Sequence, residues 1–154
     1  MKTPAWQLKT PLNAIIFDCD GTLSTIEGID ELAKNNGVDD AVLSLTAQAM
    51  GATGMNPELY QKRLDLVYPS EEQVLALGQH YIATQVPDAH PVIQLLKRLN
   101  KTVYLVSAGL YPAVKIFGRM LNIPQENIFA VDVLFDALIL QSGVVLRLFV
   151  LFLF

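Results

Sequence analysis

The sequence is poor in cysteine and in basic clusters, and its start has no long apolar run. Its 154 residues include one cysteine, Cys19, so no internal disulfide can form. Lys and Arg number 11 against 15 Asp and Glu, and no mixed basic and aromatic cluster suits a nucleic-acid backbone. The opening MKTPAWQLKTPLN lacks the apolar core of a secretory signal. We therefore expect a cytoplasmic protein without a nucleic-acid or membrane partner.

The composition is that of a folded chain, with 52% hydrophobic and 17% charged residues. Short apolar runs alternate with longer helical patterns, which favours an α/β fold. The runs at 13–17 and 103–109 are nearly continuous in apolar residues. They are predicted to be parallel strands buried on both faces.

The connection between these two strands is long and helical. Helices are predicted at 28–36, 39–50 and 58–67, and another from Ser70, where Ser-x-x-Gln73 forms a capping box. A helix around PVIQLLKRLN, 91–100, would then cross back over the sheet. We therefore predict an α/β core at 1–24 and 84–154 and a helical cap inserted at 25–83.

The first strand ends in two aspartates, in the stretch AIIFDCDGTLS. Because strand side chains alternate, Asp18 and Asp20 project to one side and Cys19 to the other. Gly21 allows a sharp turn out of the sheet. Ligands of open α/β sheets bind beyond the carboxyl ends of the strands. The two carboxylates can therefore hold a divalent cation, or act as nucleophile and proton-transfer group.

This turn has two other interpretations. A calcium loop needs an oxygen ligand, a glycine and a glutamate at its fifth, sixth and twelfth positions, where this chain has Thr22, Leu23 and Ile29. The calcium loop is therefore excluded. A plain polar turn after a strand stays open.

The second strand ends in LVSAGL, which places Ser107, Ala108 and Gly109 before a helix that begins near Pro112. A hydroxyl and backbone N–H groups at a helix entrance can cradle a phosphate. The alternative is an ordinary strand-to-helix turn in which Ser and Gly serve the geometry alone.

Taken together, these motifs resemble the haloacid dehalogenase superfamily of phosphohydrolases, and within it the phosphoserine phosphatases. FDCDGT resembles the Asp-x-Asp-x-Thr motif and VSAG the second motif of the superfamily. EGIDELAKNNGVDDAVLSLTAQAMG, 27–51, resembles the cap, and LNIPQENIFA, 121–130, resembles the segment before the next strand. The resemblance covers roughly 12–136. It implies a Rossmann-like parallel sheet of the haloacid dehalogenase type, with a small helical cap after the first strand.

The resemblance also implies a reaction, the Mg²⁺-dependent hydrolysis of L-phosphoserine in serine biosynthesis. Asp18 would be the nucleophile that forms an aspartyl-phosphate, and Asp20 the general acid and base. Mg²⁺ would be held by the Asp18 carboxylate and the Asp20 backbone carbonyl. Ser107, Ala108 and Gly109 would bind the phosphoryl group.

In the cap, the resemblance assigns substrate contacts to four residues. Glu27 would accept the substrate ammonium, Arg63 would bind its carboxylate, and Met50 and Gly51 would line the pocket. Three of them have a structural alternative: a capping box from Ser24 to Glu27, a solvated charge at Arg63, and plain core packing at Met50.

Two departures from the family pattern stand out. Asn56 replaces a pocket phenylalanine, which leaves a different small phosphomonoester as an alternative substrate. The family has a lysine and a Gly-Asp-Gly-x-x-x-Asp loop further along the chain. This sequence has neither, since its last lysine is Lys115 and its last acidic residue is Asp136. The sequence ends instead in ALILQSGVVLRLFVLFLF, which suggests strands around a Gln-Ser-Gly turn, or an unrelated tail left by truncation or a frame change. We expect self-association through the apolar run from Val144 to Phe154.

Two hypotheses of different class follow. The chain carries the nucleophile half of a phosphoserine-type phosphatase, or it is a catalytically incompetent homologue that retains a phosphate-binding crevice. With the third metal ligand and the lysine missing and the C-terminal part of the core absent, we expect negligible hydrolysis of phosphoserine by these 154 residues.

Overall fold

The structure, a computed structural model, describes residues 11–50, 57–135 and 145–147, with the backbone alone at 48–50 and 145–147. Its elements in chain order are β1 (Ala14–Phe17), α1 (Gly28–Asn36), α2 (Asp39–Met50), α3 (Pro57–Val67), α4 (Glu71–Ala83), α5 (Ala89–Arg98), β2 (Thr102–Leu110), α6 (Tyr111–Met120), the short 3₁₀ helix η1 (Gln125–Asn127), β3 (Ile128–Leu134) and β4 (Val145–Arg147). The predicted order of strands and helices is confirmed.

The helix ends follow local chemistry in the sequence. Helix α1 stops at Asn36 because Gly37 adopts the left-handed conformation, with φ of 68°. Helix α4 starts at the predicted capping box, in which the Ser70 side chain accepts from the Gln73 N–H and the Gln73 side chain bonds back to Ser70. These signals act within a few residues and could therefore be recognised without the fold.

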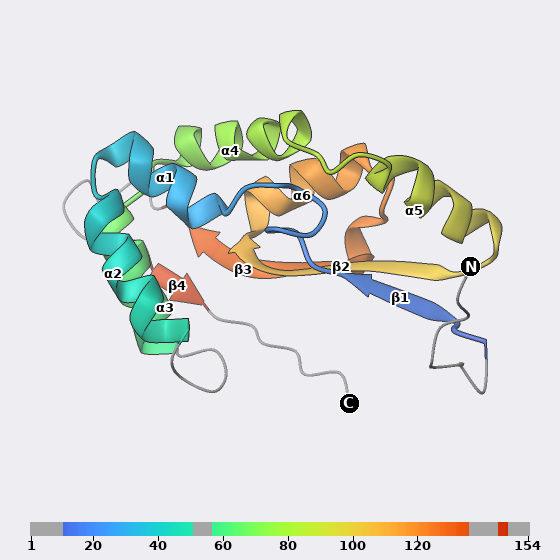
Figure 1. The fold of residues 1–154 in the computed structure, drawn as a ribbon, viewed down its shortest axis with the longest axis horizontal. Coiled ribbons are helices and arrows are strands. Elements are labelled where there is room, and N and C mark those ends of the chain that lie inside the picture. Colours follow the sequence, from blue (N-terminus) through green and yellow to red (C-terminus); the bar gives the residue numbers. More distant parts are fainter. Residues whose placement is uncertain (1–10, 51–56, 136–144, 148–154) are drawn as a thin grey trace, which may run out of the picture.

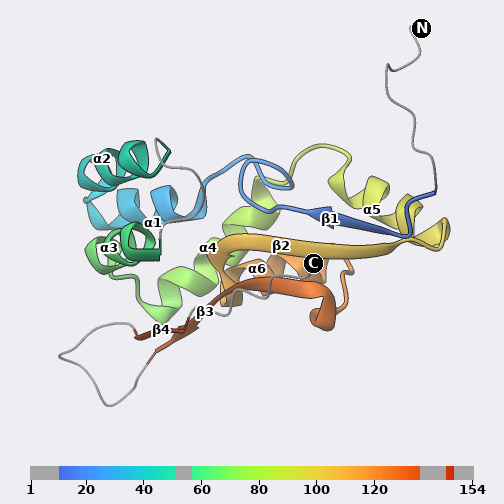
Figure 2. The same cartoon turned by 90° about the horizontal axis from the view of Figure 1, so that it is seen from below.

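The four strands form one sheet in the order β1-β2-β3-β4. Strands β1, β2 and β3 are parallel, and β4 runs antiparallel to β3. The carboxyl ends of the three parallel strands point toward the group formed by α1, α2 and α3 (Figures 1 and 2). This arrangement places the DCDG and SAG turns, which follow β1 and end β2, at the same edge of the sheet.

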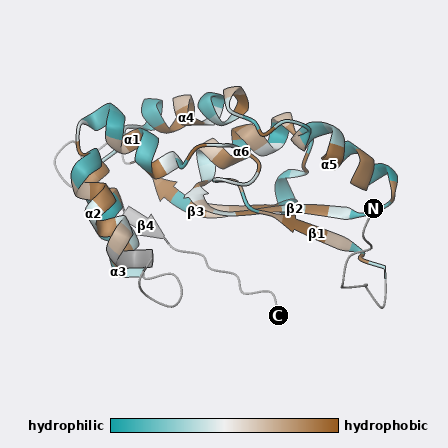
Figure 3. Ribbon diagram, viewed as in Figure 1, coloured by the Kyte–Doolittle hydropathy of each residue, from teal (hydrophilic) through white to brown (hydrophobic). Residues whose placement is uncertain are grey.

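Helices α4, α5 and α6 lie on one face of the sheet, as Figures 1 and 2 show together. Val103 and Leu105 of β2 point to that face and are buried, whereas Ile16 of β1 is 66% exposed and Val106 of β2 is 42% exposed. The prediction that both strands are buried on both faces is therefore wrong. The reason is that the face to which Ile16 and Val106 point is covered by none of the described helices (Figures 1 and 2), although the strands themselves are rich in apolar residues (Figure 3).

The C-terminal prediction is tested only in part. Val145–Arg147 forms β4 beside β3, which confirms strand-forming residues in this region. The Gln-Ser-Gly turn at 141–143 and most of the run from Val144 to Phe154 lie outside the described residues. Among the helices that the structure describes, none is long and apolar enough to cross a membrane.

Helix α4 packs along α6 and also contacts α1. Tyr81 and Phe117 are fully buried, and their rings stack with centroids 5.9 Å apart. At Gly78 a Cβ would lie 2.8 Å from the Ile116 Cβ, so the two helices meet where α4 has no side chain. The division into a core at 1–24 and 84–154 and a cap at 25–83 stays a prediction.

We expect Gly78→Leu to destabilise the protein by about 1–3 kcal/mol, because the new side chain would force α4 away from α6. The matched control is Ala76→Leu on the exposed face of the same helix, which should change stability little. Urea unfolding of both variants measures the difference. Equal stability of the two variants would show that α4 and α6 do not meet at Gly78.

Candidate active site

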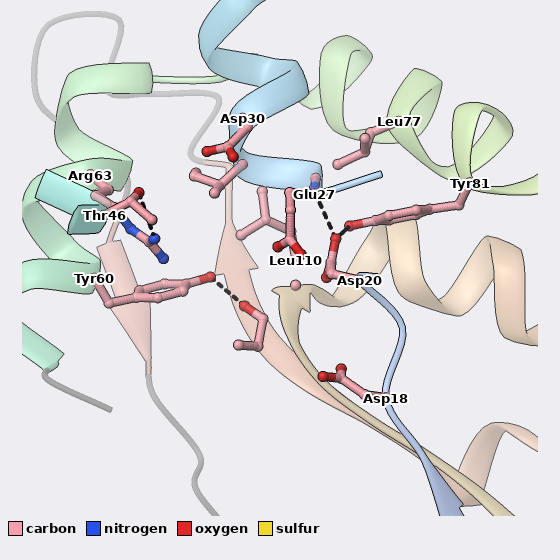
Figure 4. A pocket seen from close by; sticks show the side chains of 14 residues that line it. Asp18, Asp20, Glu27, Asp30, Thr46, Tyr60, Arg63, Leu77, Tyr81 and Leu110 are labelled. Atoms are coloured by element: carbon pink, nitrogen blue, oxygen red, sulfur yellow. Dashed lines mark hydrogen bonds between the residues drawn. The ribbon is translucent and has the colours of Figure 1, made fainter. Parts of the chain in front are cut away.

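A cavity of about 500 Å³ opens where the carboxyl ends of β1 and β2 meet α1, α3 and α4 (Figure 4). Its lining combines charged and polar side chains with aromatic and aliphatic ones. The residues that line it include Asp18, Asp20, Glu27, Gly28, Asp30, Thr46, Tyr60, Arg63, Leu77, Tyr81, Ala108 and Gly109. Six of the sequence-predicted site residues are among them.

Asp18 is the first residue after β1 and is exposed toward the cavity. Its Oδ1 accepts a 2.7 Å hydrogen bond from the Cys19 N–H, while the Cys19 side chain is fully buried on the opposite side. Partial burial raises the pKa of Asp18, the Cys19 N–H opposes this change, and the charge of Asp20 adds to it. The carboxylate is thus fixed at one oxygen by its own backbone and reachable from the cavity.

The Asp20 carboxylate receives hydrogen bonds from three separate parts of the chain. Its Oδ1 accepts from the Gly28 N–H at 2.6 Å and from the Tyr81 hydroxyl at 2.7 Å. Its Oδ2 accepts from the Ser107 hydroxyl at 3.3 Å. Because Oδ1 is engaged by two short bonds, Oδ2 is the oxygen better placed to exchange a proton with a ligand.

The end of β2 lies beside Asp20, and its pairing with β3 is irregular between Val106 and Leu110. Gly109 donates its N–H to the Ser107 Oγ at 2.8 Å, and a Cβ on Gly109 would lie 3.1 Å from the Asp20 Oδ2. Leu110 precedes α6 without a side-chain cap. Backbone N–H groups at the helix start are therefore available to an anion.

Glu27 is the N-cap residue of α1, and its carboxylate lines the cavity. The capping-box alternative from Ser24 to Glu27 is wrong, because the Ser24 hydroxyl bonds instead to the Thr84 Oγ1 at 2.8 Å. Burial raises the pKa of Glu27, as does the charge of Asp20, and Arg63 lowers it. A cationic ligand group would relieve this crowding of negative charge.

Arg63 of α3 lines the same cavity and is half-buried, so it is not a freely solvated charge. Its Nη1 donates to the Thr46 Oγ1 at 3.1 Å, and its Cζ lies 5.7 Å from the centroid of the Tyr60 ring. The Met50 side chain and all of Gly51 and Asn56 lie outside the described residues.

Sequence reasoning missed the two tyrosines of the site, Tyr60 and Tyr81. Tyr81 follows Val74 and Leu77 at helical spacing, which indicates only a buried stripe. Tyr60 precedes Arg63 by three residues, so the two share a helix face, and this spacing could have linked them.

No family model matches the chain. It is 43% identical over 122 residues to human phosphoserine phosphatase, a match that covers 77% of this chain and 52% of that protein. A crystal structure of a phosphoserine phosphohydrolase-like protein from Francisella tularensis matches with a TM-score of 0.72 and 26% identity, over 82% of this chain and 61% of that one.

A solved structure described as a phospho-aspartyl intermediate analogue of phosphoserine phosphatase matches with a TM-score of 0.67 and 28% identity. It is matched over 83% of this chain and 60% of its own length. The chain thus spans about half the length of the human protein, at 52%, and its α/β fold is that of these phosphatase structures.

We expect Gly28→Ala to cost about 1–3 kcal/mol, because the added Cβ would lie 2.0 Å from the Tyr81 Oη. Tyr81→Phe removes that oxygen. The double variant should therefore lose less stability than the sum of the two single losses, as measured by urea unfolding in a double-mutant cycle. Strict additivity would contradict the close approach of Gly28 and Tyr81.

Proposed function

We propose that the chain belongs to the phosphoserine phosphatase family of the haloacid dehalogenase superfamily over the half of those proteins that it spans, and that its site hydrolyses a small phosphomonoester, L-phosphoserine. One observation carries the proposal. Asp18, Asp20 and the Ser107–Gly109 loop meet at one edge of the sheet, and Glu27 and Arg63 face the same cavity.

In the proposed first step an Asp18 carboxylate oxygen attacks phosphorus. The new bond joins that oxygen to phosphorus, and the bond from phosphorus to the serine oxygen breaks. Asp20 in its protonated form gives its proton from Oδ2 to the departing oxygen. In the second step water attacks phosphorus, Asp20 takes a proton from that water, and the Asp18 carboxylate is released.

The proposed cofactor is Mg²⁺, and the donor set is compatible with it. The Asp18 carboxylate and the Asp20 carbonyl would hold it, and both are the hard oxygen ligands that Mg²⁺ prefers. The described part of the chain contains no cluster of three or more His, Cys, Asp and Glu side chains that could hold a metal. Mg²⁺ commonly binds through one or two carboxylates, with waters and substrate phosphate completing the shell. When bound, it would neutralise charge on the phosphoryl oxygens.

The proposed substrate follows from the charges beyond the reacting group. L-Phosphoserine carries an ammonium and a carboxylate, and the cavity presents Glu27 and Arg63. The Arg63 guanidinium can bind a carboxylate through two parallel hydrogen bonds. A role in serine biosynthesis and a cytoplasmic location are part of the same proposal.

The first test is phosphate release from L-phosphoserine with millimolar Mg²⁺. We expect the wild type to release very little phosphate. Whatever release it shows should be lost in Asp18→Asn, because the amide is a far poorer nucleophile, and kept in Asp65→Asn, which changes an exposed aspartate of α3. Release that survives Asp18→Asn would contradict the proposed nucleophile. Binding of phosphoserine without any release would favour the incompetent homologue instead.

The second test concerns recognition and uses affinity alone. Arg63→Ala should weaken binding of L-phosphoserine by roughly thirtyfold or more, since a charge-assisted pair of hydrogen bonds is lost. Binding of phosphoethanolamine, which lacks the carboxylate, should change little. Lys62→Ala, an exposed neighbour, is the control. Equal losses for both ligands, measured by calorimetric titration, would mean that Arg63 is structural.

A further inference from the structure

We propose that Tyr60 is a positioning residue of this site, which orients both the phosphate loop and the Arg63 guanidinium. The inference rests on the proposed function and deepens it. It assigns to one side chain of α3 the alignment of the groups that bind the two ends of the substrate.

The first observation is a hydrogen bond between α3 and the end of β2. The Tyr60 hydroxyl donates to the Ala108 carbonyl oxygen at 2.8 Å (Figure 4), and Tyr60 is only 6% exposed. Burial raises the pKa of Tyr60, so the hydroxyl stays protonated and remains a donor. The bond joins residues 48 positions apart in the chain.

The second observation concerns the peptide unit that this bond holds. The Ala108 carbonyl and the Gly109 N–H belong to one planar peptide group, so the direction of one fixes the direction of the other. Tyr60 holds this unit at its oxygen, and the Ser107 Oγ accepts from its N–H at 2.8 Å. When phosphate takes the N–H from Ser107, Tyr60 would still hold the peptide in the orientation that the anion needs.

The third observation concerns Arg63. Its Cζ lies 5.7 Å from the centroid of the Tyr60 ring, a cation–π distance, and Thr46 binds its Nη1. Its Nε is buried and has no hydrogen-bond partner among the described residues. The Tyr60 ring and the Thr46 hydroxyl therefore both hold the Arg63 guanidinium. This arrangement reduces the freedom that Arg63 would lose when it binds a carboxylate.

Two variants separate the two roles of Tyr60. Tyr60→Phe keeps the ring and removes the bond to Ala108, whereas Tyr60→Leu removes both. Tyr68→Phe, at an exposed tyrosine just beyond α3, is the control. The ligands are inorganic phosphate, phosphoethanolamine and L-phosphoserine, and their affinities are measured by calorimetric titration.

Tyr60→Phe should weaken the binding of all three ligands alike, by roughly two- to tenfold, because they share the phosphate loop. Tyr60→Leu should weaken L-phosphoserine by a further factor of roughly two to thirty, because only this ligand needs the aligned guanidinium. Unchanged phosphate affinity in Tyr60→Phe would overturn the loop role. Equal losses of all ligands in Tyr60→Leu would overturn the Arg63 role.

A measurement without ligand tests the positioning role of Tyr60 even if the proposed substrate is wrong. In nuclear magnetic resonance spectra, Tyr60→Phe should shift the carbonyl carbon signal of Ala108 and speed the hydrogen exchange of the Gly109 amide, while Tyr68→Phe leaves both unchanged. Unaltered Ala108 and Gly109 signals in Tyr60→Phe would overturn the proposal. Failure of the proposed function would appear elsewhere, as a wild-type protein that prefers phosphoethanolamine to L-phosphoserine.

Discussion

The hydrogen bonds to the Asp20 carboxylate fix the geometry on which the rest of the site depends. They come from Gly28 at the start of α1, from Tyr81 in α4 and from Ser107 in β2. A carboxylate that accepts from three segments holds those segments at fixed distances from one another. Because hydrogen bonds to a charged group are stronger than neutral ones, this side chain ties the start of α1 and helix α4 to the end of β2.

The need for glycine at two positions, Gly28 and Gly109, comes from this crowding around Asp20 and not from turn geometry. A side chain at Gly28 would meet the Tyr81 hydroxyl, and one at Gly109 would approach the Asp20 Oδ2. Both positions have to stay open so that backbone N–H groups can reach oxygen atoms at the centre of the site. Asp18, one residue beyond the end of β1, faces the cavity and stays outside this network. Asp18, which can be reached from the cavity, therefore lies near Asp20, whose carboxylate is held by three hydrogen bonds.

Much of the fold could be predicted from the sequence because its signals are local. The Ser70 capping box, Gly37 and the apolar runs around Ile15 and Leu105 each depend on a few neighbouring residues. Exposure of Ile16 could not be predicted, because it depends on what covers the second face of the sheet. An apolar run in the sequence carries no information about which face is covered.

Some residues of the site could likewise be predicted from local sequence signals, and others could not. The motifs indicated Asp18, Asp20, Ser107 and Gly109, since each stands at the end of an apolar strand. The tyrosines were missed because an aromatic residue at helical spacing is usually core, and only the fold brings their hydroxyls to Asp20 and Ala108. Glu27 was found, but its position as the N-cap of α1 depends on where Ser24 finds its partner, which is Thr84.

The central claim is that Asp18 reacts while Asp20 is held. A crystal structure of the chain with Mg²⁺ and beryllium trifluoride, which mimics a phosphoryl group on a carboxylate, tests it directly. We expect beryllium bound to an Asp18 carboxylate oxygen, fluorine atoms facing the Ser107 hydroxyl and the Gly109 N–H, and the Asp20 Oδ1 still bonded to Gly28 and Tyr81. Beryllium on the Asp20 carboxylate, with Asp18 left free, would contradict it.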